Sequence, residues 1–498
     1  MSAVQAASSQ YRPAGSLDAA TALLPYAGPW TPKLAAHLLR RAGFGGSPTE
    51  IDAASAAGMN AAVDALINFS RDPMPQAPDA DLSYGPMTTP QQKRQANIAM
   101  TMWFLNRVLL SPNPLLERMT YFWSNHFTSS VDGGVTPQML VNQYALFRRN
   151  ALGNFSDLTH QVSQDPAMLF YLNGAQNNKR HPNENYAREL MELFTLGVGN
   201  YTEDDVRESA RSFTGWTVNR SDDTAHFVPR LHDDGQKTFL GQTGNFTGDD
   251  IVDILLRQPV AAQFVAHKFL RHFVYDDPEP ALVAAAADIF RSSGYNVRVL
   301  MNALLRSNVF YSARAYRALI KSPLELAVGS MKLVGATEFT PRLAGGIVAM
   351  GQIPMRPPNV AGWPGGAQWM NQSTELARLN FANQLVYATP PAAGQAMTAA
   401  MSPAMTASPA SGPPAMPAMS TPMEWIGNTS MTDPGAIAER IIWIALQDDA
   451  NASQRSSILS FLQTDGVGNL VTLNGENLDE KVRGAMSLAM ATAPYQLA

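Results

Sequence analysis

The sequence predicts a mainly α-helical protein: a large multi-helix domain with a small β-hairpin insertion and a disordered Ala-, Pro- and Met-rich loop late in the chain. Three observations support this fold class. Apolar residues recur at helical spacing through most of the chain, and Pro, Ser or Thr stands at the start of many of these stretches. Only 226–241 shows short alternating runs, placed around an Asp-Gly pair. Residues 379–423 contain no Asp, Glu, Lys or Arg.

The domain organisation follows from these signals in chain order. Residues 1–30 should form an irregular arm, 31–387 a helical domain with the hairpin near 226–241, 388–423 a low-complexity linker, and 424–498 C-terminal helices that complete the same domain. Pro32 and Pro48, each preceded by a hydroxyl side chain, open the first two helices. The Gly-, Pro- and Trp-rich segment 341–371 should be an ordered loop. Further helices are expected at 90–110, 114–128, 137–150, 155–165, 249–256, 259–273, 279–293, 296–306, 322–334, 375–387, 434–447, 454–464 and 478–491.

Composition excludes several classes of function. The net charge is −5 with a pI of about 5.9, and basic residues occur in pairs rather than runs, so nucleic acid is not an expected partner. The absence of Cys removes disulfides, thiolate nucleophiles and zinc–thiolate sites. No apolar run is long enough to span a bilayer. HExxH, Walker A, GxSxG and dinucleotide fingerprints are all missing from the sequence. The start of the chain has no signal-peptide pattern and no twin-arginine leader, which predicts a cytoplasmic location unless a leader was removed.

The most strongly patterned segment is 181–216, where charge is dense in a chain with only 15% charged residues. At about 100° per residue, its polar side chains from 184 to 195 occupy roughly 140° of one helix, and apolar side chains fill the rest. Pro182 suits a first helical position, and Gly197 can end the helix. Thr202 and Asp205 have the spacing of a capping box for a second helix, which should stop near Gly215.

The same segment carries a family resemblance. HPNENYARELMELFTLGVGNYTEDDVRESARSFTGW at 181–216 resembles the signature of the DUF1800 family, a bacterial family named only as a domain of unknown function. Other segments agree in order: HLLRRAGFGGSP (37–48), FWSNHF (122–127), LGNFSDLTHQVSQDPAMLFYLN (152–173), HDDGQKTFLG (232–241), KSPLEL (321–326) and MGQIPMRPPNVAGWP (350–364). The resemblance covers nearly the whole chain and implies no settled activity. It implies that many relatives are exported and often accompany DUF1501-type proteins, which resemble sulfatase-like hydrolases.

Charged side chains on the helix at 184–195 are the first candidates for chemistry. Glu189 and Glu192 could divide acid and base roles if their pKa values differ, or could hold a hard divalent cation as the cofactor. Arg188 could bind an anionic group of a substrate. The alternative is a solvated helix face laced by ion pairs between residues four apart, each worth about 0.2–0.5 kcal/mol.

Two further candidates come from histidine-containing segments. His126 lies among aromatic residues and is either a general base or a core histidine, and Asn125 beside it either orients a substrate or caps a turn. His232 and Asp233 stand beside the expected Asp-Gly turn, with Lys237 as a nearby cation. In the functional interpretation they reach over the helical face, and in the alternative they only serve the turn.

Trp363, in the loop near 356–364, could form a sugar-stacking platform, although such aromatic residues also serve as plugs for a core. Two hypotheses therefore stay open. The first is a hydrolase or lyase on an envelope or extracellular polymer such as a polysaccharide, with Glu189 and Glu192 and either His126 or His232 as acid and base. The second is a non-catalytic binding or assembly partner of a DUF1501-type protein, in which the same residues form a structural ion network. The oligomeric state cannot be read from the sequence.

Overall fold

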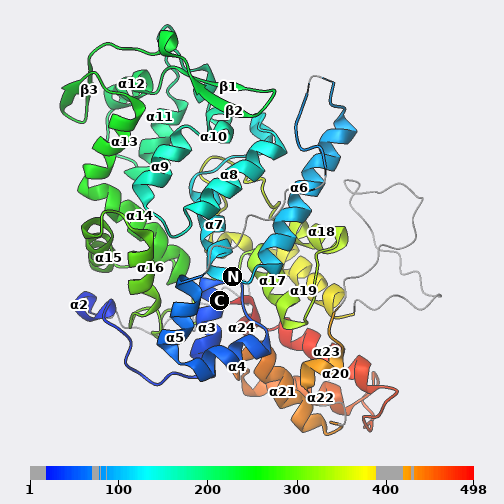
Figure 1. The fold of residues 1–498 in the computed structure, drawn as a ribbon. Coiled ribbons are helices and arrows are strands. Elements are labelled where there is room, and N and C mark those ends of the chain that lie inside the picture. The colour runs from blue at the N-terminus through cyan, green and yellow to red at the C-terminus, as the bar shows by residue number, and fades with distance from the viewer. Residues whose placement is uncertain (1–17, 70–77, 79, 86, 388–418, 428–430) are drawn as a thin grey trace.

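The computed structural model describes all residues except 1–17, 70–77, 79, 86, 388–418 and 428–430 (Figure 1). It confirms the predicted fold class, because helices make up nearly all the regular structure of the described residues and the strands form two small two-stranded sheets. Most of the linker predicted at 388–423, and most of the arm predicted at 1–30, lie outside the described residues.

The first half of the chain contains α2 (Ala19–Ala22), α3 (Pro32–Ala42), α4 (Pro48–Ala57), α5 (Met59–Ile67), α6 (Pro90–Leu110), α7 (Pro114–His126), η1 (Val131–Gly133), α8 (Pro137–Arg149), α9 (Phe155–Ser163), α10 (Pro166–Tyr171), η2 (Gly174–Gln176), α11 (Asn185–Glu189), η3 (Leu190–Thr195), α12 (Glu203–Ser212), β1 (Trp216–Asn219), β2 (Thr224–Phe227), η4 (Pro229–Leu231), β3 (Lys237–Phe239) and β4 (Gln242–Gly244).

The second half contains α13 (Gly248–Arg257), α14 (Pro259–Phe273), α15 (Pro280–Ser292), α16 (Val297–Leu305), α17 (Pro323–Leu333), α18 (Pro341–Ala349), η5 (Gly366–Trp369), α19 (Gln372–Val386), α20 (Pro422–Ile426), α21 (Pro434–Leu446), α22 (Ala452–Gln463), α23 (Leu478–Met490) and α24 (Ala493–Gln496).

Helix starts follow the local signals in the sequence. Ser47 and Thr202 both complete capping boxes, in which the hydroxyl accepts from the third backbone N–H of the helix and an acidic side chain accepts from the cap N–H. One expectation for a loop was wrong: 341–349 forms α18, whose buried Leu343 and Ile347 belong to the core. Burial of this apolar face stabilises a helix that its two glycines disfavour.

The strands differ from the predicted hairpin around Asp234 and Gly235. β1 pairs with β2 and β3 pairs with β4, so the two antiparallel hairpins flank the segment that holds the Asp-Gly pair. The reason is local: the Asp233 carboxylate accepts from the Gly235 N–H at 2.8 Å and binds Arg211 of α12, which fixes the segment against a helix instead of a second strand.

Two large hydrophobic clusters organise the packing. The first joins α3, α5 and α7 to the helices from α9 to α16, and the second joins α6 to the helices from α17 to α23 (Figure 1). Trp123 of α7 is fully buried in the first cluster, where its ring stacks on Phe155 at 5.7 Å and its indole N–H donates to the Ala151 carbonyl. These contacts fix the end of α7, which carries Asn125 and His126.

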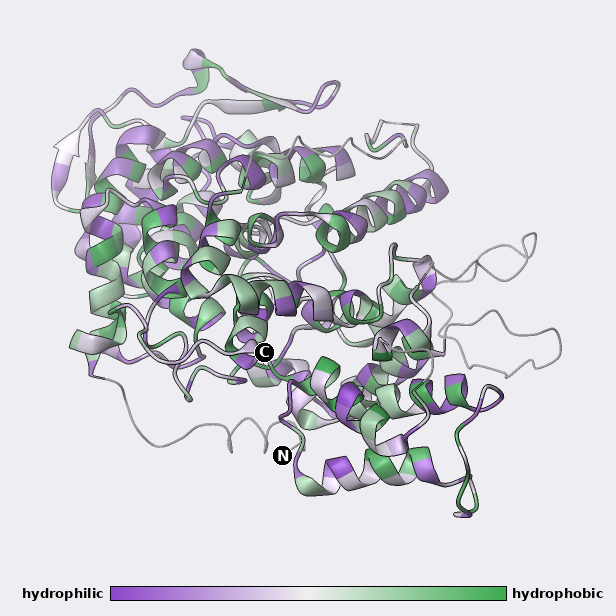
Figure 2. Cartoon of the chain, turned by 60° about the horizontal axis from the view of Figure 1, so that its bottom comes forward, coloured by the Kyte–Doolittle hydropathy of each residue, from purple (hydrophilic) through white to green (hydrophobic). Residues whose placement is uncertain are grey.

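Most helices in Figure 2 show both hydrophilic and hydrophobic stretches, as expected when one face packs on a core and the other meets solvent. Among the described helices, none is long and apolar enough to cross a membrane.

Candidate functional site

The charged segment at 184–195 is not one continuous α-helix. It begins as α11 and continues as η3, a π-helix of six residues, in which the Leu196 N–H donates to the Met191 carbonyl at 2.8 Å. A π-turn is wider than an α-turn, so the side chains after Glu189 depart from the face that a constant 100° step predicts. Short π segments are frequent at functional sites, and both Glu189 and Glu192 lie at this one, half-buried.

Arg188 is engaged by carboxylates of the protein itself. Its two terminal nitrogens each lie 2.8 Å from an oxygen of Glu203, and one also lies 3.1 Å from Glu184. The bidentate hydrogen bond to Arg188 is the main reason why the pKa of Glu203 is lowered. Because this guanidinium is already paired on an exposed surface, the arrangement matches the solvated ion network that the sequence offered as an alternative.

The two carboxylates on this segment differ in their surroundings. The Tyr201 hydroxyl donates to Glu192 at 2.8 Å, whereas the Glu189 carboxylate receives no hydrogen bond from the described residues. Burial raises the pKa of Glu189, and the neighbouring charge of Glu192 raises it further. A raised pKa is what a general acid requires, so Glu189 is the candidate for that role.

His126 is a core residue with both ring nitrogens engaged. Its Nε2 lies 3.1 Å from the carbonyl oxygen of Phe194, and its Nδ1 lies 3.2 Å from the Lys268 amine, which corresponds to the neutral tautomer with the proton on Nε2. Burial, followed by Lys268, lowers the pKa of His126. Lys268 also donates to the Leu193 carbonyl at 2.6 Å, and burial followed by Arg271 lowers its pKa to about 7.

Lys268 was not among the site residues predicted from the sequence. The only signal is a lysine in the otherwise apolar segment FVAHKFL of α14, and the same pattern fits a lysine whose amine reaches solvent. Its partners lie 75 and 142 residues away in the chain, so only the tertiary structure shows that it joins α14 to the Leu193 carbonyl of the π-helix and to His126 of α7.

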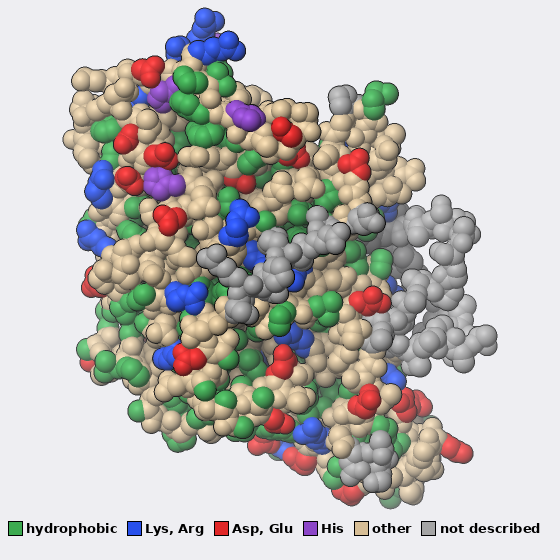
Figure 3. Space-filling view, viewed as in Figure 1, with side chains coloured by type: hydrophobic (Ala, Val, Ile, Leu, Met, Phe, Trp, Pro, Cys, Tyr) green, Lys and Arg blue, Asp and Glu red, His purple; other side chains and the backbone are tan. Residues whose placement is uncertain are grey.

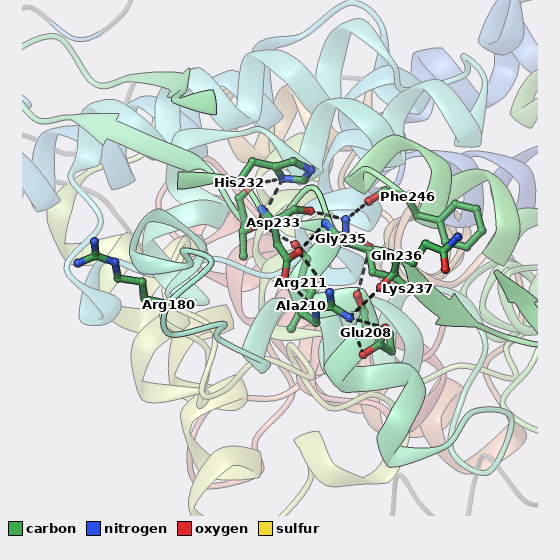
Figure 4. Close-up of polar contacts among 12 residues, drawn as sticks. Arg180, Glu208, Ala210, Arg211, His232, Asp233, Gly235, Gln236, Lys237 and Phe246 are labelled. Atoms are coloured by element: carbon green, nitrogen blue, oxygen red, sulfur yellow. Dashed lines mark hydrogen bonds and ion pairs between the residues drawn. The ribbon is translucent and has the colours of Figure 1, made fainter. Parts of the chain in front are cut away.

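His232 and Asp233 belong to a network that anchors the hairpins on α12 (Figure 4). His232 is buried, and its Nδ1 lies 2.8 Å from the Thr214 carbonyl oxygen. Asp233 accepts from Arg211 at 2.8 and 3.2 Å, and Arg211 also binds Glu208. The hydrogen bonds from Arg211 are the main reason why the pKa of Asp233 is lowered, so this carboxylate is a fixed anion.

Lys237 completes the same network instead of serving as a free cation. It is almost fully buried, and its amine donates to the Phe246 carbonyl at 2.8 Å and to the backbone carbonyl of Asp233. Asn245 accepts a third hydrogen bond at 3.3 Å. All three protons of the ammonium are therefore used to hold β3 and β4 in place, and burial lowers the pKa of Lys237.

Asn125 and Trp363 bind each other. The Trp363 backbone N–H donates to the Asn125 side-chain oxygen at 2.6 Å, which holds the loop at 356–364 against the end of α7. Gly362 has a φ of 84°, and a Cβ there would lie 2.6 Å from the Asn125 carbonyl oxygen. The Trp363 ring lies 5.8 Å from the Trp369 ring and packs against the small apolar cluster that contains Trp369 and Leu497. This packing fits a core plug better than an open platform for a sugar.

The structure thus divides the predicted site residues into separate networks. No described contact joins Glu189 or Glu192 to either imidazole, and neither carboxylate lines the cavity beside Arg40 or the cavity beside Tyr121. The described part of the chain holds no group of three or more His, Asp or Glu residues with metal-binding geometry. The predicted residues fall into an ion network around Arg188, a core pair of His126 with Lys268, the hairpin anchor around Arg211, and the clamp of Asn125 with Trp363.

A basic face, made of Lys179, Arg180 and Arg230, lies beside the hairpins. All three side chains are exposed, and the Lys179 N–H bonds the Leu231 carbonyl at 2.8 Å, which brings the two segments together. Figure 3 shows Lys and Arg side chains gathered at the end of the molecule that carries the hairpins, and Figure 4 shows Arg180 turned away from the Arg211 network. None of the three side chains has a partner among the described residues.

Comparison with known proteins places these features in a family without assigning them. A family model described as "Protein of unknown function (DUF1800)" matches residues 37–497. No curated protein and no solved structure matches the chain.

Proposed function

The chain belongs to the DUF1800 family, and from that premise we propose that it is a non-catalytic binding or assembly protein whose basic face receives an anionic partner. The family resemblance suggests a DUF1501-type protein as this partner. The proposal rests on how the predicted site residues are used: most of them hold the protein's own elements together, and their charges are already paired.

The observation that carries the proposal is the contrast between paired and unpaired charges at the hairpin end. Arg188 engages Glu184 and Glu203, and Arg211 engages Glu208 and Asp233. Each arginine is thus engaged by two carboxylates, and in the described structure none of these four acids contacts the basic face. Three exposed cations without partners among the described residues therefore lie together on this face, in a chain whose net charge is −5.

Apolar surface accompanies this charge. Phe227, the last residue of β2, is 44% exposed, and Arg230 follows three residues later. An aromatic residue beside arginine is the composition enriched in the centre of protein–protein interfaces. Together they support a protein partner in preference to a small anion.

Charge reversal tests the proposal. A triple variant Lys179→Glu, Arg180→Glu, Arg230→Glu should weaken binding to a purified DUF1501-type protein by at least tenfold, measured by biolayer interferometry. Wild-type affinity should fall as salt rises from 50 to 300 mM, since screening lengths drop to about 8 Å near 0.15 M. The matched control is Arg291→Glu on the exposed surface of α15, which should bind as the wild type does. Equal binding by the triple variant would refute the proposal.

A second candidate function is acid–base catalysis at Glu189 and Glu192. The specific observation in its favour is the pKa of Glu189, raised by burial beside a second carboxylate on a π-helix. A polysaccharide hydrolase or lyase screen should compare the wild type with a Glu189→Gln, Glu192→Gln variant, alongside metal analysis of both proteins for a divalent cation. Catalysis would be favoured if the double variant loses activity and the charge-reversed variant keeps it. Equal activity of the wild type and the double variant would refute a catalytic role for Glu189 and Glu192.

A further inference from the structure

A second concentration of charge lies far from the basic face, inside the protein. Six cationic side chains, here called the cation cluster, are each at most 8% exposed. They come from α3, α7, the segment before α17, and α19. The members are Arg40, Arg41, Arg118, Arg317, Lys321 and Arg378.

Few carboxylates accompany the cluster. Glu325 binds Arg118, and Asp449 accepts from Arg317 at 2.6 Å and from the partly exposed Lys33 at 3.1 Å. The negative charge of Glu375 raises the pKa of Arg378. Asp276 also raises the pKa of Arg41, so four acids accompany six buried basic groups, and burial lowers the pKa of Lys321 well below its usual range.

Several guanidinium groups of the cluster are only partly hydrogen-bonded. Arg40 donates one nitrogen to the Gln447 side chain at 2.6 Å, and Arg41 donates one to the Ala315 carbonyl at 2.5 Å. Their other two nitrogens, and two of Arg118, have no partner among the described residues. Buried donors of this kind cost free energy unless something accepts their hydrogen bonds.

A cavity of about 40 Å³ lies next to these groups. Arg40, Arg317, Lys321 and Glu325 line it, together with Gln447. One water needs about 10–15 Å³ measured in the same way, so the space suits a few waters or one small oxyanion and excludes a nucleotide. Arg317 already uses its N–H groups on protein oxygens, whereas Arg40 retains two unpartnered nitrogens.

We propose that this cavity binds inorganic phosphate in a protonated form, held by Arg40 and Lys321. The Arg40 fork can donate to two phosphate oxygens, and Lys321, which donates to the Tyr495 carbonyl at 2.6 Å, has further protons to give. This binding site goes beyond the proposed partner role, involves none of the residues of the basic face, and depends on none of them.

Glu325 selects among oxyanions. Its two oxygens face Arg118 and the Ser322 N–H, and each can accept one more hydrogen bond. Burial opposes its ionisation, but Arg118 and His272 bring the pKa of Glu325 to about 2, so it is a fixed carboxylate. The O–H of hydrogen phosphate can donate a hydrogen bond to this carboxylate, whereas sulfate is fully ionised near neutral pH, has no O–H to donate and would be repelled.

The site would join distant parts of the chain. Its lining comes from 36–51, 317–333, 444–447 and 495–498, and Figure 1 shows α3 and α24 near each other beside the C label. A bound phosphate would therefore stabilise the folded chain by linkage, with a melting temperature that rises with the logarithm of phosphate concentration above the dissociation constant.

The experiment uses the full chain and inorganic phosphate. Extensively dialysed protein is titrated by calorimetry and by thermal melting with sodium phosphate or sodium sulfate at matched ionic strength and pH 7, and phosphate released on denaturation is assayed. We expect saturable binding of one phosphate per chain, or retained phosphate in equal amount, and at least tenfold weaker binding of sulfate. Arg40→Lys, which keeps the charge and loses the fork, should weaken phosphate binding at least tenfold. Arg291→Lys on α15 should bind as the wild type does.

Three outcomes would overturn the proposal. One is wild-type protein that neither retains phosphate nor responds to it saturably, which would leave water as the acceptor for the buried donors. The second is equal binding of phosphate and sulfate. The third is unchanged phosphate affinity in a folded Arg40→Lys variant. If Arg40→Lys fails to fold by circular dichroism, the two wild-type measurements decide alone. Loss of partner binding in the charge-reversed variant of the basic face would change none of these results.

Discussion

Replacement of Lys268 by Met should change how the stability of the protein depends on pH. Lys268 is largely enclosed between α14 and the π-helix, and its pKa falls from the ordinary 10.5 to about 7 because of burial and then of Arg271. Methionine has a similar length and no charge, so the variant removes the titrating group and keeps most of the packing.

The sign follows from proton binding. Between pH 7 and 10.5 the lysine is protonated in the unfolded chain and mostly neutral in the folded protein. The unfolded state then binds more protons, so the free energy of unfolding rises with pH across this window. At about 1.4 kcal/mol per pH unit, the whole window corresponds to at most about 4–5 kcal/mol, and about 2–3 kcal/mol falls between pH 7.5 and 9.5.

Urea denaturation at pH 7.5 and 9.5 measures this effect. The free energy of unfolding of the wild type, less that of Lys268→Met, should increase by about 2–3 kcal/mol between the two pH values, because other titrating groups cancel in the difference. Lys179→Met, on the exposed basic face, is the matched control for loss of a lysine. Parallel pH dependence in the wild type and Lys268→Met would show that the amine is protonated in the folded protein, and would refute the reasoning.

Three further predictions concern the framework. Glu117→Ala should lower the free energy of unfolding by about 3–5 kcal/mol in urea, because Glu117 is fully buried and its carboxylate is shared by Arg107 and Arg148 at 3.0 Å; a loss below 1 kcal/mol would contradict this. Arg211→Ala should raise amide hydrogen exchange at 233–246 at least tenfold, since charge-assisted hydrogen bonds worth about 1.5–3 kcal/mol hold that segment; unchanged exchange would argue against the anchor. Gly362→Ala should lower the free energy of unfolding by about 1–3 kcal/mol, because Gly362 has a positive φ and lies close to the Asn125 carbonyl. A variant that melts at the wild-type temperature would contradict this.

The fold was predictable where local chemistry decides it. Helix starts such as Ser47 and Thr202 satisfy backbone N–H groups with side chains three residues away, so short sequence windows contain the whole signal. α18 was not predictable in the same way, because Gly345 and Gly346 disfavour a helix and only packing of Leu343 against other elements compensates. The π-helix was also not predicted, because the helix face was calculated with a constant rotation per residue and the rotation changes in a π-helix.

The candidate site was less predictable, because its meaning depends on long-range partners. The charge density around Arg188 was visible, but Glu203, which engages it, stands 15 residues further along on another helix. Asp233 beside Gly235 had the composition of a hairpin turn, yet Arg211 from 22 residues earlier captures its carboxylate. In both cases, the residue types were correct for a charged site and the sequence could not show that the charges were already paired.

The two adjacent arginines of α3 show why buried charge in this protein calls for a functional explanation. Arg40 and Arg41 are adjacent in a short amphipathic helix, yet burial lowers the pKa of Arg40 to about 10 and that of Arg41 to about 9. Replacing buried ionic groups with apolar residues of similar volume is often neutral or stabilising, so stability alone does not account for them. Partner carboxylates account for Arg317, which satisfies its N–H groups on Asp449 and backbone carbonyls, but not for Arg40. The difference between these two neighbours on one cavity is what an anionic ligand would explain.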